Sequence, residues 1–168
     1  MFILAIDPSG NFKQGKGTTG WILGNVNKTE IKFGSIKAED YESEQEYWMA
    51  HTKLIELLKP SYIVIEDYLL YANKAQAQIN SRFETSKLIG IIEVYCYTNN
   101  IPITFQQARQ VKKRWSEEIL IHRGMLQKAN NHYYLNGTVI NNHARDALKH
   151  YMHFVTFQLP KKVGKTKC

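Results

Sequence analysis

Two apolar runs that each end in an acidic residue constrain the fold of this chain more than any other feature. Residues 2–6 read Phe-Ile-Leu-Ala-Ile and lead directly into Asp7, and residues 62–65 read Tyr-Ile-Val-Ile and lead into Glu66. Runs of this length and composition are typical of buried strands. A carboxylate at the exit of a buried strand is costly unless it holds a cation or a proton. The two acids are therefore candidates for a shared site.

The rest of the hydrophobic pattern predicts an α/β fold with a mixed sheet of five strands. The predicted elements are strands over 2–7, 20–26 and 30–37, a helix over 43–58, a strand over 62–66, a helix over about 75–98, a strand over 102–105 and a helix over about 142–156. The first three strands form an antiparallel meander, and the later two are parallel additions flanked by helices. In that topology the first strand can lie beside the strand that follows the first helix, so that Asp7 and Glu66 become neighbours.

A third acid lies near the end of the chain, in the segment Asn-His-Ala-Arg-Asp at 142–146. His143 and Asp146 are three residues apart on a predicted helix and therefore share one face. Together with the two strand-end acids they form a candidate catalytic and metal-binding set.

Each residue of this set could also have a purely structural role when it is considered alone. The first acid could start a turn, and Asp67 is an equal substitute for the second. The helix acid could pair with Arg145 or Lys149 at the surface. His143 could be a surface residue. His150, two turns further on, could approach the site but is interpreted as a core or surface histidine. The joint placement of the set favours the functional interpretation.

A set of carboxylates suits Mg²⁺, which prefers oxygen ligands and keeps several waters. Two such ions about 3.5–4 Å apart can activate a water and stabilise a leaving oxygen. Asp7 is the expected bridging ligand, with Glu66, His143 and Asp146 beside it. The histidine makes Mn²⁺ an alternative metal. The predicted chemistry is phosphodiester hydrolysis.

The charge balance favours a polyanionic partner. Lys and Arg number 22 against 15 Asp and Glu, which gives a net charge of +7, and nucleic acid is the commonest partner of such chains. A basic protein without such a partner is the alternative. We expect one domain over 1–157 and a basic tail over 158–168. No apolar run approaches the roughly 20 residues of a membrane helix, no signal peptide is evident, and two cysteines suit a cytoplasmic protein.

Five short motifs carry a family resemblance over nearly the whole chain to about residue 155. They are Ala5-Ile6-Asp7-Pro8, Thr19-Gly20-Trp21, Ile63-Val64-Ile65-Glu66, Ala108-Arg109-Gln110-Val111-Lys112 and His143-Ala144-Arg145-Asp146-Ala147-Leu148. In this order they resemble the RuvC Holliday junction resolvases. The resemblance implies a ribonuclease H-like fold, with two divalent metals held at the positions of Asp7, Glu66 and Asp146 and an acid or a histidine at the position of His143.

The resemblance also implies an activity and a partner. Such enzymes resolve four-way DNA junctions by paired nicks, in the cytoplasm of a bacterial cell or a phage-infected host. They act as homodimers, and a two-fold junction calls for two identical sites. The nearly all-apolar helix 83–97 is the candidate interface. The expected DNA contacts are Lys13, Lys16, Tyr68, Tyr71, Arg109, Lys112, Lys113 and Arg114. The two tyrosines are expected to stack on opened bases, with plain packing as the alternative.

The chain departs from the family pattern in two places, and other functions stay open. The loop after Asp7 is longer than usual, and Trp-Ser-Glu-Glu at 115–118 replaces a glycine- and lysine-bearing stretch. A relaxed debranching nuclease would fit these departures. A ribonuclease for RNA–DNA hybrids and a non-catalytic binder of branched DNA are further alternatives. The glycine-rich loop 15–20 is similar to the phosphate loop of actin and sugar-kinase relatives, which need a second domain.

Overall fold

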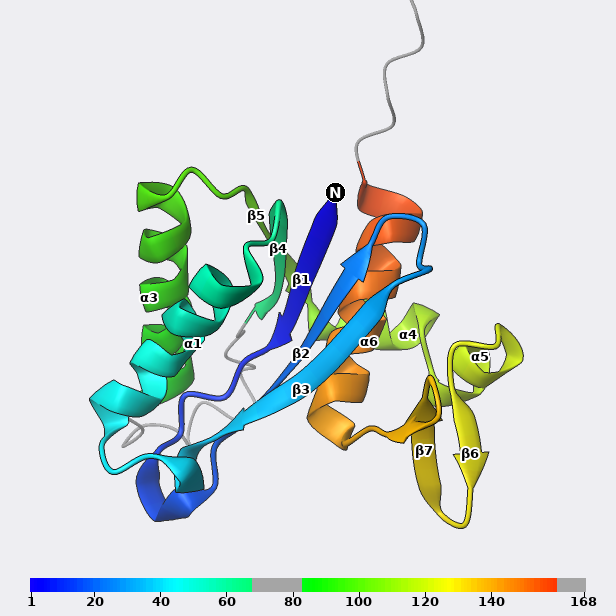
Figure 1. The fold of residues 1–168 in the computed structure, drawn as a ribbon, viewed down its shortest axis with the longest axis horizontal. Coiled ribbons are helices and arrows are strands. Elements are labelled where there is room, and N and C mark those ends of the chain that lie inside the picture. Colours follow the sequence, from blue (N-terminus) through cyan, green and yellow to red (C-terminus); the bar gives the residue numbers. More distant parts are fainter. Residues whose placement is uncertain (68–82, 160–168) are drawn as a thin grey trace, which may run out of the picture.

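The computed structural model describes residues 1–67 and 83–159, and its centre is a five-stranded mixed sheet (Figure 1). The strands are β1 (Phe2–Asp7), β2 (Thr18–Asn25), β3 (Ile31–Lys37), β4 (Tyr62–Asp67) and β5 (Ile103–Gln107), in the order β3-β2-β1-β4-β5. Strands β1, β2 and β3 pair antiparallel, and β4 and β5 join β1 in parallel. The predicted sheet of three antiparallel strands with parallel additions is therefore confirmed.

Helices cover both faces of the sheet, which explains why β1 is apolar on both sides. Helices α1 (Glu44–Leu58) and α3 (Glu84–Thr98) lie on one face, and α6 (Asn142–His153) lies on the other (Figure 1). Along β1, Leu4 and Ile6 pack in the core under α1 and α3, whereas Ile3 and Ala5 pack in the core under α6. This alternation follows from the two-residue period of a strand.

The helix ends follow local signals in the sequence. Ser43 caps α1 by accepting a hydrogen bond from the Glu46 amide at 3.2 Å, and the left-handed Lys59 (φ 45°) ends the helix before Pro60. The predicted helix over 75–98 is observed from Glu84, and its first part lies outside the described residues. Helix α6 ends earlier than predicted, at His153, where the backbone widens into a π-helical turn over Phe154–Gln158.

The segment between β5 and α6 forms a small lobe that the sequence pattern did not predict. It contains α4 (Ala108–Arg114), α5 (Glu117–His122) and a second antiparallel sheet of β6 (Gln127–Ala129), β7 (His132–Leu135) and β8 (Thr138–Val139). Two-residue turns join these strands at Asn130-Asn131 and Asn136-Gly137, where every φ is positive. Asn-Gly is a typical signal of such hairpins. The strands are only 3, 4 and 2 residues long, too short for a clear alternation of apolar residues.

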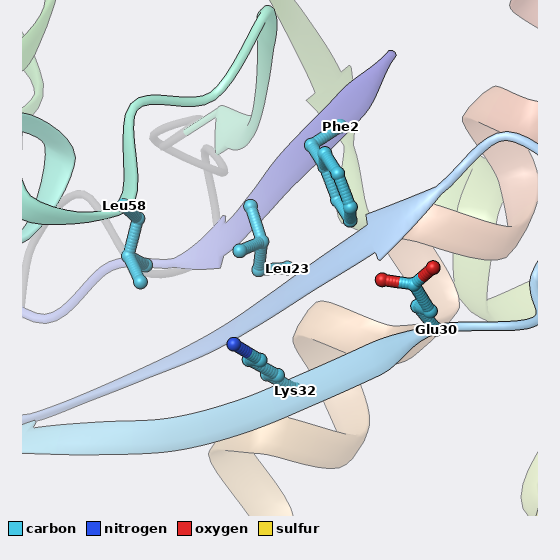
Figure 2. A pocket seen from close by; sticks show the side chains of 5 residues that line it. All are labelled: Phe2, Leu23, Glu30, Lys32 and Leu58. Atoms are coloured by element: carbon cyan, nitrogen blue, oxygen red, sulfur yellow. The ribbon is translucent and has the colours of Figure 1, made fainter.

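Two short 3-10 helices, η1 (Lys13–Gly15) and η2 (Ala38–Asp40), complete the fold near the start of α1. At the end of β1 remote from Asp7, the side chains of Phe2, Leu23 and Leu58, with Glu30 and Lys32, line a pocket of about 200 Å³ (Figure 2). Among the helices of residues 1–67 and 83–159, none has both the length and the apolar character to cross a membrane.

Candidate acidic site

Asp7 and Glu66 lie next to each other because their strands pair in parallel. Ile6 is opposite Ile65 across β1 and β4, so both chains leave the sheet at the same edge with an acid as the next residue. Ala5 and Val64 face α6, and side chains two residues apart share a face. Asp7 and Glu66 therefore also face α6. The Asp67 side chain points to the opposite face of the sheet, because successive residues of a strand alternate. Glu66 is therefore the better candidate for the site.

The start of α6 comes close to Asp7 because Gly20 leaves room for it. Gly20 is the partner of Asp7 across β1 and β2, and a Cβ at this position would overlap the backbone of His143 and Ala144. The helix begins there because the Asn141 side chain accepts a hydrogen bond from the Ala144 amide at 2.8 Å. This close approach brings His143 and Asp146 over the ends of β1 and β4.

Each acid of the cluster is held by a basic side chain. His143 Nδ1 lies 3.1 Å from Asp7 Oδ2, and His150 Nε2 lies 2.9 Å from Glu66 Oε2. Lys149 Nζ lies 2.7 Å from Asp146 Oδ1 and 2.8 Å from Glu117 Oε1.

Lys112 of α4 lies between two of the acids. Its Nζ is 2.8 Å from Asp146 Oδ2 and 3.8 Å from Glu66 Oε2. Burial opposes the charge on Lys112, but the hydrogen bond to Asp146 and the surrounding carboxylates raise its pKa above the usual value. The lysine is therefore a firmly charged cation inside the cluster.

The three carboxyl groups differ in how well their charge is balanced. Burial is the main reason why the pKa of Asp7 is raised; the hydrogen bond from His143 opposes this rise, and the charges of Glu66 and Asp146 add to it. Burial would also raise the pKa of Glu66, but His150 and Lys112 hold it below its usual value. Burial would also raise the pKa of Asp146, but the hydrogen bonds and charges of Lys112 and Lys149 together lower it. Asp7 is thus the acid with the least compensation.

The donor set suits a divalent cation, although the side chains are not arranged around one. Within residues 1–67 and 83–159, no three His, Cys, Asp or Glu side chains converge closely enough to form a ready metal site. Carboxylate oxygens are nevertheless the ligands that Mg²⁺ prefers, and an imidazole suits Mn²⁺. The Lys112 ammonium lies between Glu66 and Asp146 and gives them the positive charge that a metal would otherwise supply.

His150 and Lys149 belong to this cluster, although the predicted site set includes neither of them. His150 is fully buried, as one of the alternatives for it stated, but its two ring nitrogens contact Glu66 and the Gln106 side chain, the latter at 2.7 Å. Lys149 pairs with Asp146 as one alternative proposed, yet it is 5% exposed and not a surface residue. The spacing of His143, Asp146 and His150, three and then four residues, was the available signal.

The residues expected to contact DNA fall into three groups. Lys112 lies in the acidic cluster, whereas Arg109, Lys113 and Arg114 are exposed elsewhere on α4. Lys13 and Lys16 are exposed at η1. Tyr68 and Tyr71 lie outside the described residues.

Comparison with known proteins supports the fold. No protein-family model and no curated protein matches the chain. Among solved structures, Thermus thermophilus RuvC in complex with a Holliday junction substrate has a TM-score of 0.60 at 18% sequence identity, with 89% of each chain covered. A second structure of Thermus thermophilus RuvC has a TM-score of 0.57 at 19% identity, covering 89% of this chain and 90% of that one. The chain therefore has the ribonuclease H-like fold of RuvC, as the sequence motifs predicted.

Proposed function

We propose that this chain is a metal-dependent endonuclease that resolves Holliday junctions, the four-way branched form of DNA, by paired symmetric nicks. The observation that carries the proposal is the convergence of Asp7, Glu66 and Asp146, which come from three separate elements, at one edge of the sheet. The fold shared with RuvC, one structure of which holds a Holliday junction substrate, supports the choice of DNA as the substrate.

In this proposal Asp7, Glu66, His143 and Asp146 would hold two Mg²⁺ ions, with Asp7 as the central ligand and Mn²⁺ as a substitute. Bound there, the ions would activate a water and stabilise the leaving oxygen of the phosphodiester. Asp7 suits the central position because, within residues 1–67 and 83–159, it forms no ion pair with a lysine and bears the least balanced charge. His150 and Lys149 orient the carboxylates of Glu66 and Asp146.

Lys112 has two roles in the proposed enzyme. Without a metal, its ammonium balances the charge of Glu66 and Asp146. A divalent cation at these carboxylates would repel the ammonium, which is 43% exposed and is carried by a flexible side chain. Lys112 would then be available to a DNA phosphate next to the cleavage site.

DNA binding is proposed to rest mainly on phosphates, in keeping with the net charge of +7. The proposed contacts are Lys13, Lys16, Arg109, Lys112, Lys113 and Arg114, with Tyr68 and Tyr71 as stacking residues. We assign the nuclease unit to residues 1–157 and treat 158–168 as a basic tail. Such an enzyme would act on DNA in the cytoplasm of a bacterial or phage-infected cell.

A homodimer would supply the two cuts of a symmetric junction. The outer face of α3 supports this assembly: Val94 is 63% exposed, Tyr97 is 85% exposed, and the space beside Gly90 is open to 4 Å. Exposed apolar side chains that form a contiguous patch can mark a protein–protein interface. We propose this face, within the predicted helix 83–97, as the dimer interface.

A cleavage assay tests the proposal. Four-way, three-way, flap and linear duplex DNA are incubated with the protein and Mg²⁺ or Mn²⁺, with Asp7→Asn as the control, and the cuts are mapped on each strand. Symmetric nicks in the four-way junction, absent with the variant, are expected. Equal cutting of three-way and flap DNA would indicate a debranching nuclease in place of a resolvase. Binding without cutting of any substrate would leave only a branch-binding protein.

A further inference from the structure

A basic pocket lies on α4 and α6, the helices that also supply Lys112 and Asp146 to the acidic cluster. Gln110, Lys113 and Arg114 of α4 line it together with His153 of α6 and Phe157 of the π-helical turn. Its volume is about 460 Å³, within the rough range of 300–1,000 Å³ of small-ligand pockets. The described residues that line it include two cations and no acid, so the pocket is suited to an anion.

The pocket contains an aromatic ring that is exposed but held in place. Phe157 is 52% exposed. Its ring lies 4.8 Å from the Arg114 guanidinium and 5.3 Å from the His153 ring. The exposed part of this ring offers a stacking surface, and flat rings such as DNA bases stack on aromatic side chains with little dependence on sequence.

His153 has a hydrogen-bonding atom without a partner. The residue is only 7% exposed, and its Nδ1 makes no hydrogen bond within the described structure. Burial, followed by the charges of Arg114 and His150, lowers the pKa of His153, so the ring is neutral at neutral pH. A buried polar atom without a partner is rare in folded proteins, and this one belongs to a residue that lines the pocket.

The pocket and the acidic cluster lie along one stripe of α6 and its continuation. His143, Asp146, His150, His153 and Phe157 follow at spacings of three and four residues, which places them on one face of a helix. From Asp146 to His153 the helix rises about 10 Å, the length of about three nucleotide steps in a duplex strand.

Hydrogen bonds also link the pocket to the acidic cluster. The Gln106 side chain accepts from His150 at 2.7 Å and donates to Gln158 Oε1 at 2.6 Å. Gln158 follows Phe157 in the π-helical turn. The wall of the pocket is thereby tied to the histidine that contacts Glu66.

We propose that this pocket binds one unpaired nucleotide of the DNA, with the phosphate at Lys113 and Arg114 and the base on Phe157 within reach of His153. A paired base is covered by its neighbours in the stack and has no free face for Phe157, so the pocket selects strands with an open base. This inference rests on the proposed function, because it places the nucleotide near the strand to be cut.

Binding of labelled DNA to the full chain tests the inference. The probe is a fluorescein-labelled ten-residue oligothymidylate, in EDTA so that no cleavage occurs, with a duplex of equal length beside it. Phe157→Leu keeps an apolar side chain of similar size but removes the ring. It should weaken oligothymidylate binding by roughly 5- to 100-fold and leave duplex binding nearly unchanged. Phe2→Leu, an exposed aromatic residue in the pocket of Figure 2, is the matched control and should bind as the wild type does.

A second variant tests the inference independently, in case Phe157→Leu does not fold. Lys113→Ala changes an exposed side chain and should also weaken oligothymidylate binding, whereas Lys32→Ala in the pocket of Figure 2 should not. Wild-type affinity in a folded Phe157→Leu, or no oligothymidylate binding by the wild type at tens of micromolar, overturns the inference. Should Phe157→Leu misfold, unchanged binding by Lys113→Ala overturns it.

The outcomes for the pocket and for the nuclease are separable. If junction cleavage requires Asp7 but oligothymidylate binding does not depend on Phe157, the nuclease proposal is supported and the nucleotide-pocket proposal is rejected. Oligothymidylate binding that depends on Phe157, without cleavage of any branched DNA, would support the nucleotide pocket and contradict the proposed nuclease activity.

Discussion

The Lys112 ammonium and the Asp146 carboxylate form an ion pair of 2.8 Å inside the acidic cluster. The lysine comes from α4 and the acid from α6, so the contact depends on the packing of two helices that are distant in sequence. If Lys112 balances charge in place of a metal, it competes with divalent cations for the same oxygens.

Lys112→Met should therefore bind Mn²⁺ more tightly than the wild type in the absence of DNA, by roughly tenfold, which corresponds to about 1.4 kcal/mol. The same variant should bind four-way DNA more weakly, with a salt dependence reduced by about one phosphate contact. Calorimetric titration of Mn²⁺ and junction binding over a range of salt concentrations measure the two effects. Lys53→Met, an exposed lysine on α1, is the control. Equal Mn²⁺ affinity in Lys112→Met and the wild type would contradict the competition.

Asp7→Asn should lower the cleavage rate by roughly 10³-fold or more, a loss typical of removing a central catalytic group. The amide keeps the size of the carboxyl group but lacks the charge that a bridging ligand needs. Junction binding in EDTA should stay within a few-fold of the wild type, because it rests on phosphate contacts. Single-turnover rates and binding by fluorescence anisotropy check the two parts. Cleavage at the wild-type rate by Asp7→Asn would show that Asp7 is not a metal ligand.

Gly20→Ala should destabilise the protein by roughly 1–3 kcal/mol, the usual cost of forcing an extra methyl group into a packed region. The new Cβ would overlap the backbone at the start of α6 and displace His143 from Asp7. Gly90→Ala is the control, because its Cβ meets nothing within 4 Å and alanine favours a helix by about 1 kcal/mol. Urea unfolding compares the two variants. Equal stability of both would show that α6 is not held against β2 at this point.

The stability of the protein should fall as the pH drops from about 6.5 towards 4, in part because of His51. This residue is 1% exposed. Its Nδ1 donates to the Tyr47 carbonyl and its Nε2 lies 2.8 Å from Thr19 Oγ1. Burial lowers its pKa to about 4 in the folded state, so in this window the unfolded chain takes up the proton first. The contribution is fully present above pH 6.5 and amounts to about 3 kcal/mol.

His51→Gln should flatten this dependence. Glutamine can still contact both partners but does not take up a proton in this range. Urea unfolding at intervals between pH 4.5 and 7.5 gives the slope for both proteins. A slope as steep in His51→Gln as in the wild type would show that other groups cause the loss.

Val94→Glu should convert a dimer into a monomer, because it places a charge at the centre of the exposed apolar face of α3. Light scattering at micromolar concentrations measures the molar mass, and the variant should lose paired cutting of the junction. Val139→Glu, which is 53% exposed on β8, is the matched control and should leave the dimer intact. A wild-type protein that is monomeric under these conditions would remove α3 as an interface.

Much of the fold could be predicted because it depends on local patterns. The apolar residues of β1 and β4, the Ser43 cap of α1 and the Asn141 cap of α6 all act within a few residues of the chain. The lobe of β6, β7 and β8 was missed because its strands are too short to show a period, although Asn136-Gly137 marked one of its turns.

The sequence by itself determined which side chains end the strands, which share a helix face, and therefore which residues could meet. Backbone geometry sets these relations, since a strand repeats every two residues and a helix every 3.6. Only the tertiary structure decided the partners: Lys112 between Glu66 and Asp146, and His150 against Glu66 and Gln106. These contacts join β4, β5, α4 and α6. Their geometry depends on how helices and strands from distant parts of the chain pack, which no local period encodes.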